Sequence, residues 1–172
     1  MPDAAFDPAS EIVTVVDEHD RPIRTTTRAE VRARNLLHRG VGILVRNRSG
    51  EIYVHRRTQT KDVFPGMMDM FVGGTVAAGE PYEQAAGREL AEELGITDAP
   101  LVYLFKHRYE GADNNCLTAV FEVVWDGEIV HQAEEIAWGA WLTEDEVISK
   151  LAEWDWVPDG KAVFEAYLAQ KR

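Results

Sequence analysis

Alternating and continuous apolar segments along the chain predict a protein dominated by short strands. EIVTVVD (11–17) is rich in β-branched residues, a polar turn follows it, and IRTTT (23–27) resumes the pattern, so the two segments predict a hairpin. Further strands are predicted, in chain order, at 40–47, 51–57, 70–76, 101–110, 116–125 and 135–142. Between the second and third of these, residues 58–69 are expected to form a loop.

Capping signals predict where the helices begin and end. Thr27 and Glu30 have the spacing of a capping box before the segment AEVRARN. A proline lies in the first turn of the helix predicted at 81–94, and a glycine follows its last residue. Two more helices are predicted at 144–153 and at about 160–170. Because helices are scattered among the strands, the fold class is predicted to be α/β (α+β), with a mixed β-sheet sandwiched between helices and an N-terminal β-hairpin extension.

The length of the chain and the composition of its first residues indicate how it divides into segments and domains. Its 172 residues correspond to one domain or to one domain with a short extension. We expect a flexible tail at 1–10, the hairpin and a short helix at 11–35, and the main domain at 36–168. No apolar run approaches the roughly 20 residues of a membrane span, and the first ten residues lack a signal-peptide pattern. A single cysteine, Cys116, fits a reducing compartment, so we expect a cytoplasmic protein with no membrane partner.

The net negative charge of the chain argues against anionic binding partners. The chain carries 18 Lys and Arg against 30 Asp and Glu, a formal charge of −12. Such a surface repels the phosphate backbone of nucleic acids, so we expect no nucleic-acid partner. An acidic protein would bind phosphate groups only through metal ions or a focused group of arginines.

The helix predicted at 81–94 places three carboxylates on one face. Glu89, Glu92 and Glu93 stand at positions i, i+3 and i+4, so they share one helical face. A separate apolar stripe of the same helix can be buried. Arg88 can offset only part of their repulsion. Mg²⁺ prefers such oxygen ligands and often bridges them to substrate phosphates. On charge spacing alone, a solvated acidic helix face is the competing interpretation.

The segment 74–96, GTVAAGEPYEQAAGRELAEELGI, resembles the signature of the Nudix hydrolase family, the Nudix box. That pattern is G-x5-E-x7-R-E-U-x-E-E-x-G-U, where U is aliphatic, and this chain matches it at every specified place. The matching residues are Gly74, Glu80, Arg88, Glu89, Leu90, Glu92, Glu93, Gly95 and Ile96. The resemblance implies a Nudix domain at 36–168 that hydrolyses a nucleoside diphosphate linked to another group.

The resemblance also implies roles for single residues. Glu89 and Glu93 would bind Mg²⁺, or Mn²⁺ in its place, with Gly74 offering its backbone carbonyl. Glu92 would join the metal or act as the base. Glu80 and Arg88 would orient these glutamates. A further catalytic carboxylate often lies outside the box, and here Glu134 and Glu135 occupy that region, with Glu135 preferred.

A second resemblance covers roughly residues 11–145 and concerns the isopentenyl-diphosphate isomerase branch of the family. It rests on LHR before a strand and on the segment HRRTQTKDVFPG. It implies that Arg57 and Lys61 bind a diphosphate, a task suited to a guanidinium fork and an ammonium group. The isomerase cysteine, one metal ligand and the acidic residue are replaced here by Val72, Gly74 and Asn114. The complete box and the missing thiol favour a hydrolase on an isomerase-like frame.

These observations predict a Mg²⁺-dependent enzyme that cleaves a phosphoanhydride bond in a small-molecule diphosphate. Metal ions would polarise the phosphoryl oxygens while a glutamate accepts the proton of the attacking water. An isomerase of prenyl diphosphates and a ligand-binding module without catalysis are the alternatives. The sequence leaves the substrate, the number of metal ions and the catalytic base open, and the family is compatible with a homodimer.

Overall fold

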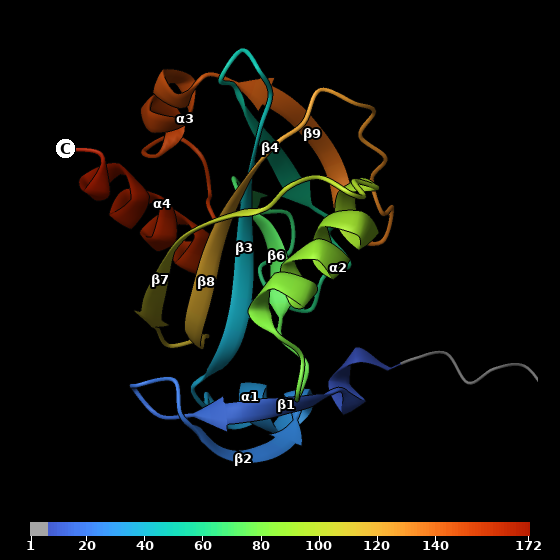
Figure 1. The fold of residues 1–172 in the computed structure, drawn as a ribbon, viewed down its shortest axis with the longest axis vertical. Coiled ribbons are helices and arrows are strands. Elements are labelled where there is room, and N and C mark those ends of the chain that lie inside the picture. The colour runs from blue at the N-terminus through green and yellow to red at the C-terminus, as the bar shows by residue number, and fades with distance from the viewer. Residues whose placement is uncertain (1–6) are drawn as a thin grey trace, which may run out of the picture.

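A single long strand, β3 (His38–Arg46), organises the fold of this computed structural model, which describes residues 7–172 (Figure 1). Before it come η1 (Pro8–Ser10), β1 (Ile12–Val16), β2 (Pro22–Thr27) and α1 (Arg28–Arg34). After it come β4 (Ile52–Arg57), β5 (Met68–Asp69), β6 (Val72–Thr75), α2 (Tyr82–Leu94), β7 (Val102–Glu110), β8 (Asn115–Val124), β9 (Ile136–Leu142), α3 (Glu144–Lys150) and α4 (Pro158–Gln170).

The strands join into one mixed sheet. β3 pairs in parallel with β8 along its whole length and antiparallel with β1, β6 and the start of β4. β8 continues antiparallel to β7, whereas β4 continues antiparallel to β5 and β9. The predicted mixed sheet is therefore confirmed, and β6, the strand that leads into the 74–96 segment, lies directly beside β3.

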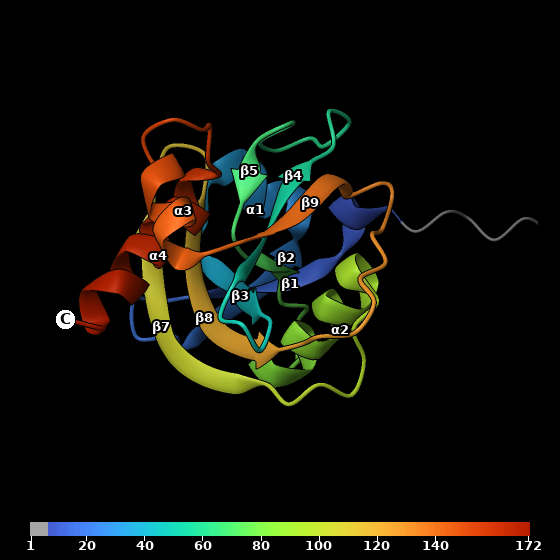
Figure 2. The same cartoon turned by 90° about the horizontal axis from the view of Figure 1, so that it is seen from above.

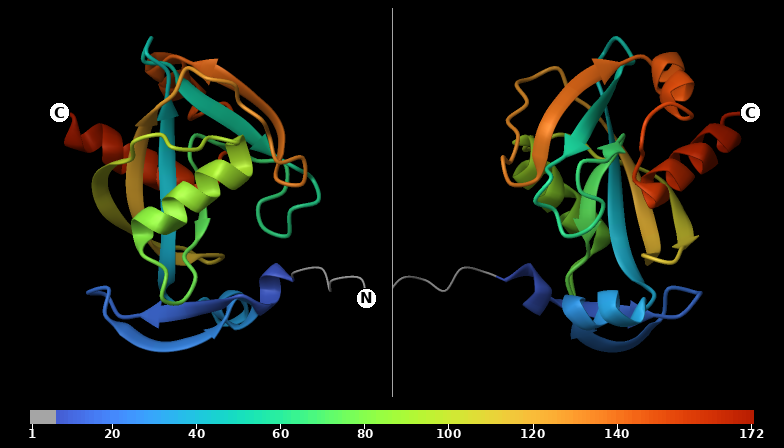
Figure 3. Two further views of the ribbon diagram at one scale, coloured as in Figure 1. Left: turned by 45° about the vertical axis from the view of Figure 1, so that its right-hand side comes forward. Right: turned by 180° about the vertical axis from the view of Figure 1, so that it is seen from behind.

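Helices cover both faces of this sheet because successive side chains of β3 point to opposite sides. Val41, Ile43 and Val45 belong to one core cluster together with Leu90 and Leu94 of α2. Leu44 belongs to a second cluster that includes the side chains of α3 and α4. Figure 2 shows α2 on one side of β3 and β8 and the two C-terminal helices on the other, and Figure 3 gives the same arrangement from two further sides.

The N-terminal hairpin and α1 form a separate small layer at one end of the molecule (Figure 1). Val13, Val15 and Val31 make up a core cluster of their own. Asp20, at the hairpin turn, accepts hydrogen bonds from Arg39 Nε at 2.6 Å and from Lys106 Nζ at 2.7 Å. These contacts attach the hairpin to the main sheet, so α1 is held in a defined position.

Several details of the predicted elements need correction. Residues 1–6 of the predicted tail lie outside the described residues, and Pro8–Ser10 forms a short 3₁₀ helix capped by Asp7. The predicted loop 58–69 ends in the two-residue strand β5. At Thr27 only half of the predicted capping box forms, because the Glu30 carboxylate binds Arg24 and Arg34 instead.

No helix within residues 7–172 combines the length and the apolar character that a membrane crossing requires.

Candidate active site

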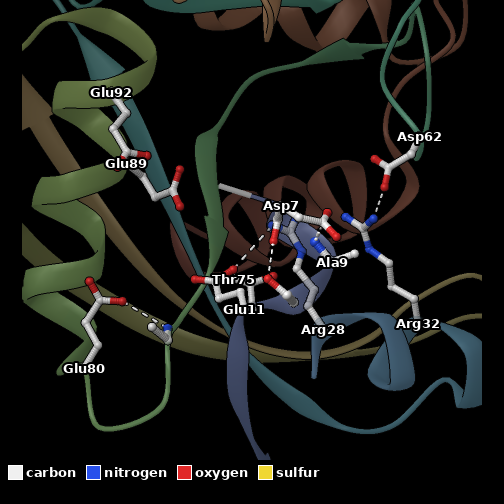
Figure 4. Close-up of polar contacts among 12 residues, drawn as sticks. Asp7, Ala9, Glu11, Arg28, Arg32, Asp62, Thr75, Glu80, Glu89 and Glu92 are labelled. Carbon is white, nitrogen blue, oxygen red and sulfur yellow. Dashed lines mark hydrogen bonds and ion pairs between the residues drawn. The ribbon is translucent and has the colours of Figure 1, made fainter. Parts of the chain in front are cut away.

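The loop from β6 to α2 is held in shape by the Glu80–Arg88 pair. Arg88 donates from Nε to Glu80 Oε1 at 2.9 Å and from Nη2 to Glu80 Oε2 at 3.1 Å. Glu80 Oε2 also accepts the backbone N–H of Ala77 at 3.0 Å, a contact drawn in Figure 4. The Arg88 hydrogen bonds lower the pKa of the Glu80 carboxyl, so this pair stays ionised. The structure therefore places Glu80 and Arg88 together, beside the glutamates of α2.

Arg88 also reaches two glutamates of its own helix. Its Nη1 donates to Glu89 at 2.9 Å and to Glu92 at 3.4 Å. Figure 4 shows Glu89 and Glu92 projecting from α2 toward the same side. The side chain of Glu92 is 49% exposed, whereas that of Glu89 is largely buried. One guanidinium thus serves three carboxylates and cannot neutralise them all.

Glu93 is the most buried of the box glutamates, with 8% of its surface exposed. Its carboxylate accepts the backbone N–H of Gly73 at 3.3 Å. Burial, and then the charges of Glu89 and Glu135, raise the pKa of the Glu93 carboxyl well above its usual value. Burial also raises the pKa of Glu89. A bound cation would favour the ionised form of both groups, so the fold holds oxygen ligands where positive charge is lacking.

Gly74 gives the Glu89 carboxylate its space. A Cβ at this position would lie 2.5 Å from Glu89 Oε1, so only glycine lets the carboxylate approach the strand. Gly74 is paired with Val41 in the ladder between β6 and β3.

The backbone carbonyl of Gly74, which the resemblance assigns to the metal, points away from the glutamates. In an antiparallel ladder, N–H and C=O of one residue face the same side, and neighbouring residues face opposite sides. The N–H of Gly73 faces Glu93, and the carbonyl of Thr75 accepts Arg88 Nη2 at 3.3 Å. Gly74 between them therefore directs its carbonyl toward β3, and the backbone oxygen on the side of the glutamates belongs to Gly73.

Glu135 approaches the box from a distant part of the chain. It precedes β9, forms an ion pair with Lys61, and is close enough to Glu93 to raise its pKa. Glu134 and Glu135 both line the groove that contains the box glutamates. The structure thus brings Glu135 to the predicted place, with Lys61 beside it.

Four cationic side chains line the other parts of this groove, and two of them are the residues that the sequence predicts to bind a diphosphate. Arg57 and Lys61 are present as predicted. Arg57 donates from Nε and Nη2 to the carbonyl of Val63, at 3.2 and 2.9 Å, and so anchors the loop that carries Lys61. Arg28 and Arg32 of α1 complete the set. Their i, i+4 spacing on one helical face was the available signal, but nothing local indicated that α1 faces the box.

The two arginines of α1 differ in their pairing: Arg32 forms an ion pair with Asp62, whereas Arg28 is poorly paired. Arg28 has a weak contact to Glu11 at 3.5 Å, and its buried Nε has no hydrogen-bond partner among residues 7–172. Burial, and then the charges of Arg28 and Arg57, lower the pKa of Arg32. Figure 4 shows Arg28 and Arg32 across the groove from Glu89. The carboxylates of α2 therefore lie across the groove from the guanidinium groups of α1, which have Glu11 and Asp62 beside them. This arrangement suits a metal ion on one side and an anion on the other.

The carboxylates do not form a closed metal cage by themselves. Within residues 7–172, no three His, Cys, Asp or Glu side chains are placed to hold a metal ion. Glu92 turns outward to Arg88, and Glu135 is paired with Lys61. The oxygen donors still suit Mg²⁺, which keeps several waters and completes its shell with substrate phosphates.

The positions that would carry isomerase chemistry lie together, behind β6, but with other residues. Val72, Gly74 and Asn114 line one cavity with Cys116. Burial raises the pKa of the Cys116 thiol to about 12, so it stays protonated and unreactive.

Known proteins share both the sequence and the fold. The NUDIX domain family matches residues 36–166. An uncharacterized Nudix hydrolase of Streptomyces coelicolor, SCO1686, is 45% identical over 164 residues, covering 94% of this chain and 91% of the relative. A second, PA4841 of Pseudomonas aeruginosa, is 40% identical over 159 residues, covering 92% and 94%. The crystal structure of DR0079 from Deinococcus radiodurans superimposes with a TM-score of 0.81 at 26% identity, covering 91% of this chain and 98% of that one. The chain therefore belongs to the Nudix family and is a Nudix hydrolase.

Proposed function

We propose that this protein is a Mg²⁺-dependent pyrophosphohydrolase that cleaves the phosphoanhydride bond of a nucleoside diphosphate derivative or a related organic diphosphate. The observation that carries the proposal is that carboxylates on one side of the groove face arginines on the other. Carboxylates that burial makes costly to ionise face arginines that repel one another. A metal ion with a diphosphate would compensate both at once. Mn²⁺ would serve in place of Mg²⁺, and a cytoplasmic site of action fits the buried free thiol of Cys116.

The residues would divide the work by their chemistry. Glu89 and Glu93, with the Gly73 carbonyl, supply the hard oxygen donors for the metal, and Glu92 adds another when it leaves Arg88. When bound, the metal polarises a phosphoryl oxygen and lowers the pKa of a coordinated water. Glu135 is the carboxylate best placed to accept the proton of the attacking water, because it stands beside Glu93 and is oriented by Lys61.

The cationic side chains would bind and orient the substrate. Guanidinium groups form paired hydrogen bonds with phosphate oxygens, so Arg28, Arg32 and Arg57 would hold the diphosphate across from the carboxylates. Lys61 would add a point charge once the phosphate competes with Glu135 for it. In-line displacement at phosphorus depends mainly on such positioning and on charge neutralisation.

The test is cleavage of a panel of nucleoside diphosphate derivatives and prenyl diphosphates, followed as the monophosphate products, with and without Mg²⁺. Glu93→Gln is expected to lower kcat by more than the roughly 10–100-fold typical of a residue that only orients a ligand. Glu165→Gln is the matched control, since Glu165 is exposed on α4, on the opposite face of the sheet.

Three outcomes would oppose the proposal. Turnover that needs no metal would remove the role of the carboxylates. Conversion of isopentenyl diphosphate to its isomer without phosphate release would favour the isomerase. Saturable Mg²⁺ and diphosphate binding with no turnover of any substrate would favour a binding module.

A further inference from the structure

A cavity of about 180 Å³ lies behind β6 and opens toward the groove of the box glutamates. The two spaces share six lining residues: Arg28, Arg32, Arg57, Gly73, Gly74 and Glu93. The mouth of the cavity is therefore formed by the three arginines, by the glycine pair of β6 and by Glu93 of α2. A group attached to a phosphate in the groove would have this cavity directly next to it.

The cavity is lined by polar groups that the fold leaves partly unused. Asp159, in the first turn of α4, accepts Asn114 Nδ2 through Oδ2 at 3.2 Å, but its buried Oδ1 has no partner among residues 7–172. His55 of β4 is only 3% exposed, and its Nδ1 is likewise without a partner in the described chain. Buried polar atoms without partners are costly, so natural proteins rarely keep them without a reason. Their presence in one cavity indicates a site built for a polar ligand.

Asp69 of β5 adds a second carboxyl to this cavity. Its Oδ1 accepts the backbone N–H of Phe71 at 3.0 Å and leaves no room for a side chain at Gly160, where a Cβ would lie 2.5 Å away. Burial, and then the charge of Asp159, raise the pKa of Asp69 to about 7. The raised pKa favours the protonated carboxyl at Asp69, which then offers an O–H donor beside the free acceptor oxygen of Asp159.

The rest of the wall is apolar and sets the size of the guest. Val31, Phe64, Phe71, Val72 and Val163 line it. An engineered apolar cavity of about 150 Å³ holds one benzene ring, and pockets for drug-sized ligands start near 300 Å³. A cavity of about 180 Å³ therefore suits one six-membered ring with small substituents and is too small to enclose the sugar of a nucleoside as well.

We infer that this cavity binds the ring of the substrate, and that the ring is an aminopyrimidine whose amino group and ring nitrogen face Asp159 and Asp69. The inference rests on the proposed function, because the groove would hold the attached diphosphate. An exocyclic amino group supplies the donor that the free Asp159 oxygen needs, and an adjacent ring nitrogen accepts the proton of the Asp69 carboxyl. A keto group at the same place would set oxygen against oxygen, and a prenyl chain would leave all the polar atoms unpaired.

The first test uses ligands without phosphate, so it depends neither on metal nor on hydrolysis. Cytidine and uridine, which differ in one amino-to-keto exchange, are titrated into ¹⁵N-labelled protein in the presence of EDTA. We expect cytidine to shift the amide signals of Gly42 and Gly160 in a saturable way, with at least roughly tenfold higher affinity than uridine. Equal affinities, or no shifts at these amides, would overturn the inference.

Two variants and a control make this test specific. Asp159→Asn replaces the free acceptor oxygen and is expected to bring the cytidine-to-uridine ratio close to one. Asp145→Asn is the control, since Asp145 is exposed in the first turn of α3, and it should leave the ratio unchanged. Gly42→Ala adds a methyl group at ordinary contact distance, 3.5 Å from Thr118 and 3.6 Å from Phe71, and should weaken cytidine binding by filling the cavity.

The second test measures hydrolysis of CDP, UDP and isopentenyl diphosphate with Mg²⁺. Faster turnover of CDP, lost in Asp159→Asn, is the expected result. Selective cytidine binding without any turnover would leave the cavity assignment standing and overturn the proposed hydrolase. Mg²⁺-dependent turnover with a preference for UDP or isopentenyl diphosphate would do the reverse, supporting the hydrolase and overturning the aminopyrimidine.

Discussion

At the scale of single residues, the buried carboxyl groups of this fold lie in two different settings. Glu89 and Glu93 stand at the groove without enough positive charge, which suits a metal ion. Asp69 stands deeper, against the N-terminus of α4, with Asp159 as its neighbour. Its pKa of about 7, against an ordinary value of 3.8, makes the two states of this group accessible near neutral pH.

The raised pKa of Asp69 predicts a pH dependence of stability. Between about pH 4 and pH 7 the unfolded chain has lost this proton while the folded protein keeps it, so the stability that Asp69 contributes is present at low pH and is lost as pH rises. The slope is at most about 1.4 kcal/mol per pH unit for one group. Urea unfolding at pH 5 and pH 7.5, with EDTA present, measures it.

Asp69→Asn isolates this effect from the other carboxyls. The variant cannot ionise, so the difference in unfolding free energy between the two pH values should become smaller than in the unsubstituted protein. Asp145→Asn, at an exposed position, should change nothing. An unchanged pH dependence in Asp69→Asn would show that Asp69 is already ionised in the folded state.

At the scale of elements, α1 and α2 face each other across the groove with opposite charge. α2 presents its glutamates, and α1 presents Arg28 and Arg32 at adjacent turns of one face. Because these arginines repel each other and Arg57, an anion placed among them relieves unfavourable charge. The short helix is therefore the part of the groove that we propose to bind the anion, a role that its sequence alone does not reveal.

Replacing both arginines, Arg28→Gln with Arg32→Gln, should weaken the binding of a diphosphate. Calorimetry with methylene diphosphonate, which is not hydrolysed, and Mg²⁺ should show a loss of affinity of at least about tenfold, or 1.4 kcal/mol. Arg34→Gln is the control on the same helix, since Arg34 is exposed and pairs with Glu30 away from the groove. Equal effects of the two changes would mean that only net charge matters.

The sequence predicts features that depend on neighbouring residues and misses those that depend on contacts between distant parts of the chain. α2 and its cap depend on local signals, and the complete pattern from Gly74 to Ile96 identified the box glutamates. The direction of the Gly73 carbonyl depends on strand register with β3, which no local pattern contains. Likewise, Arg28 reaches the site because contacts between distant parts of the chain, such as those of Asp20 with Arg39 and Lys106, attach the hairpin layer.

At the scale of the whole molecule, the groove exists only when separate parts of the chain come together. α1 comes from the N-terminal layer, Lys61 from the loop after β4, and Glu135 from the segment before β9. Asn114 and Asp159 close the cavity behind β6 from two further elements. An unfolded chain has none of these arrangements, so any ligand of the groove binds the folded state alone and must stabilise it.

Mg²⁺ is therefore expected to raise the melting temperature of the protein. At a concentration 100 times the dissociation constant, binding adds about 2.7 kcal/mol, and for a chain of this size each kcal/mol corresponds to about 2–4 °C. Glu93→Gln should lose most of this increase, because a neutral amide is a poor ligand for a hard cation. A protein with a net charge of −12 also attracts cations weakly and non-specifically over its surface. The comparison is thus made in NaCl solutions of matched ionic strength and beside Glu165→Gln, which removes one charge from the exposed face of α4. If both variants keep the full increase, Mg²⁺ stabilises the protein only through its overall charge, and the box is not the metal site.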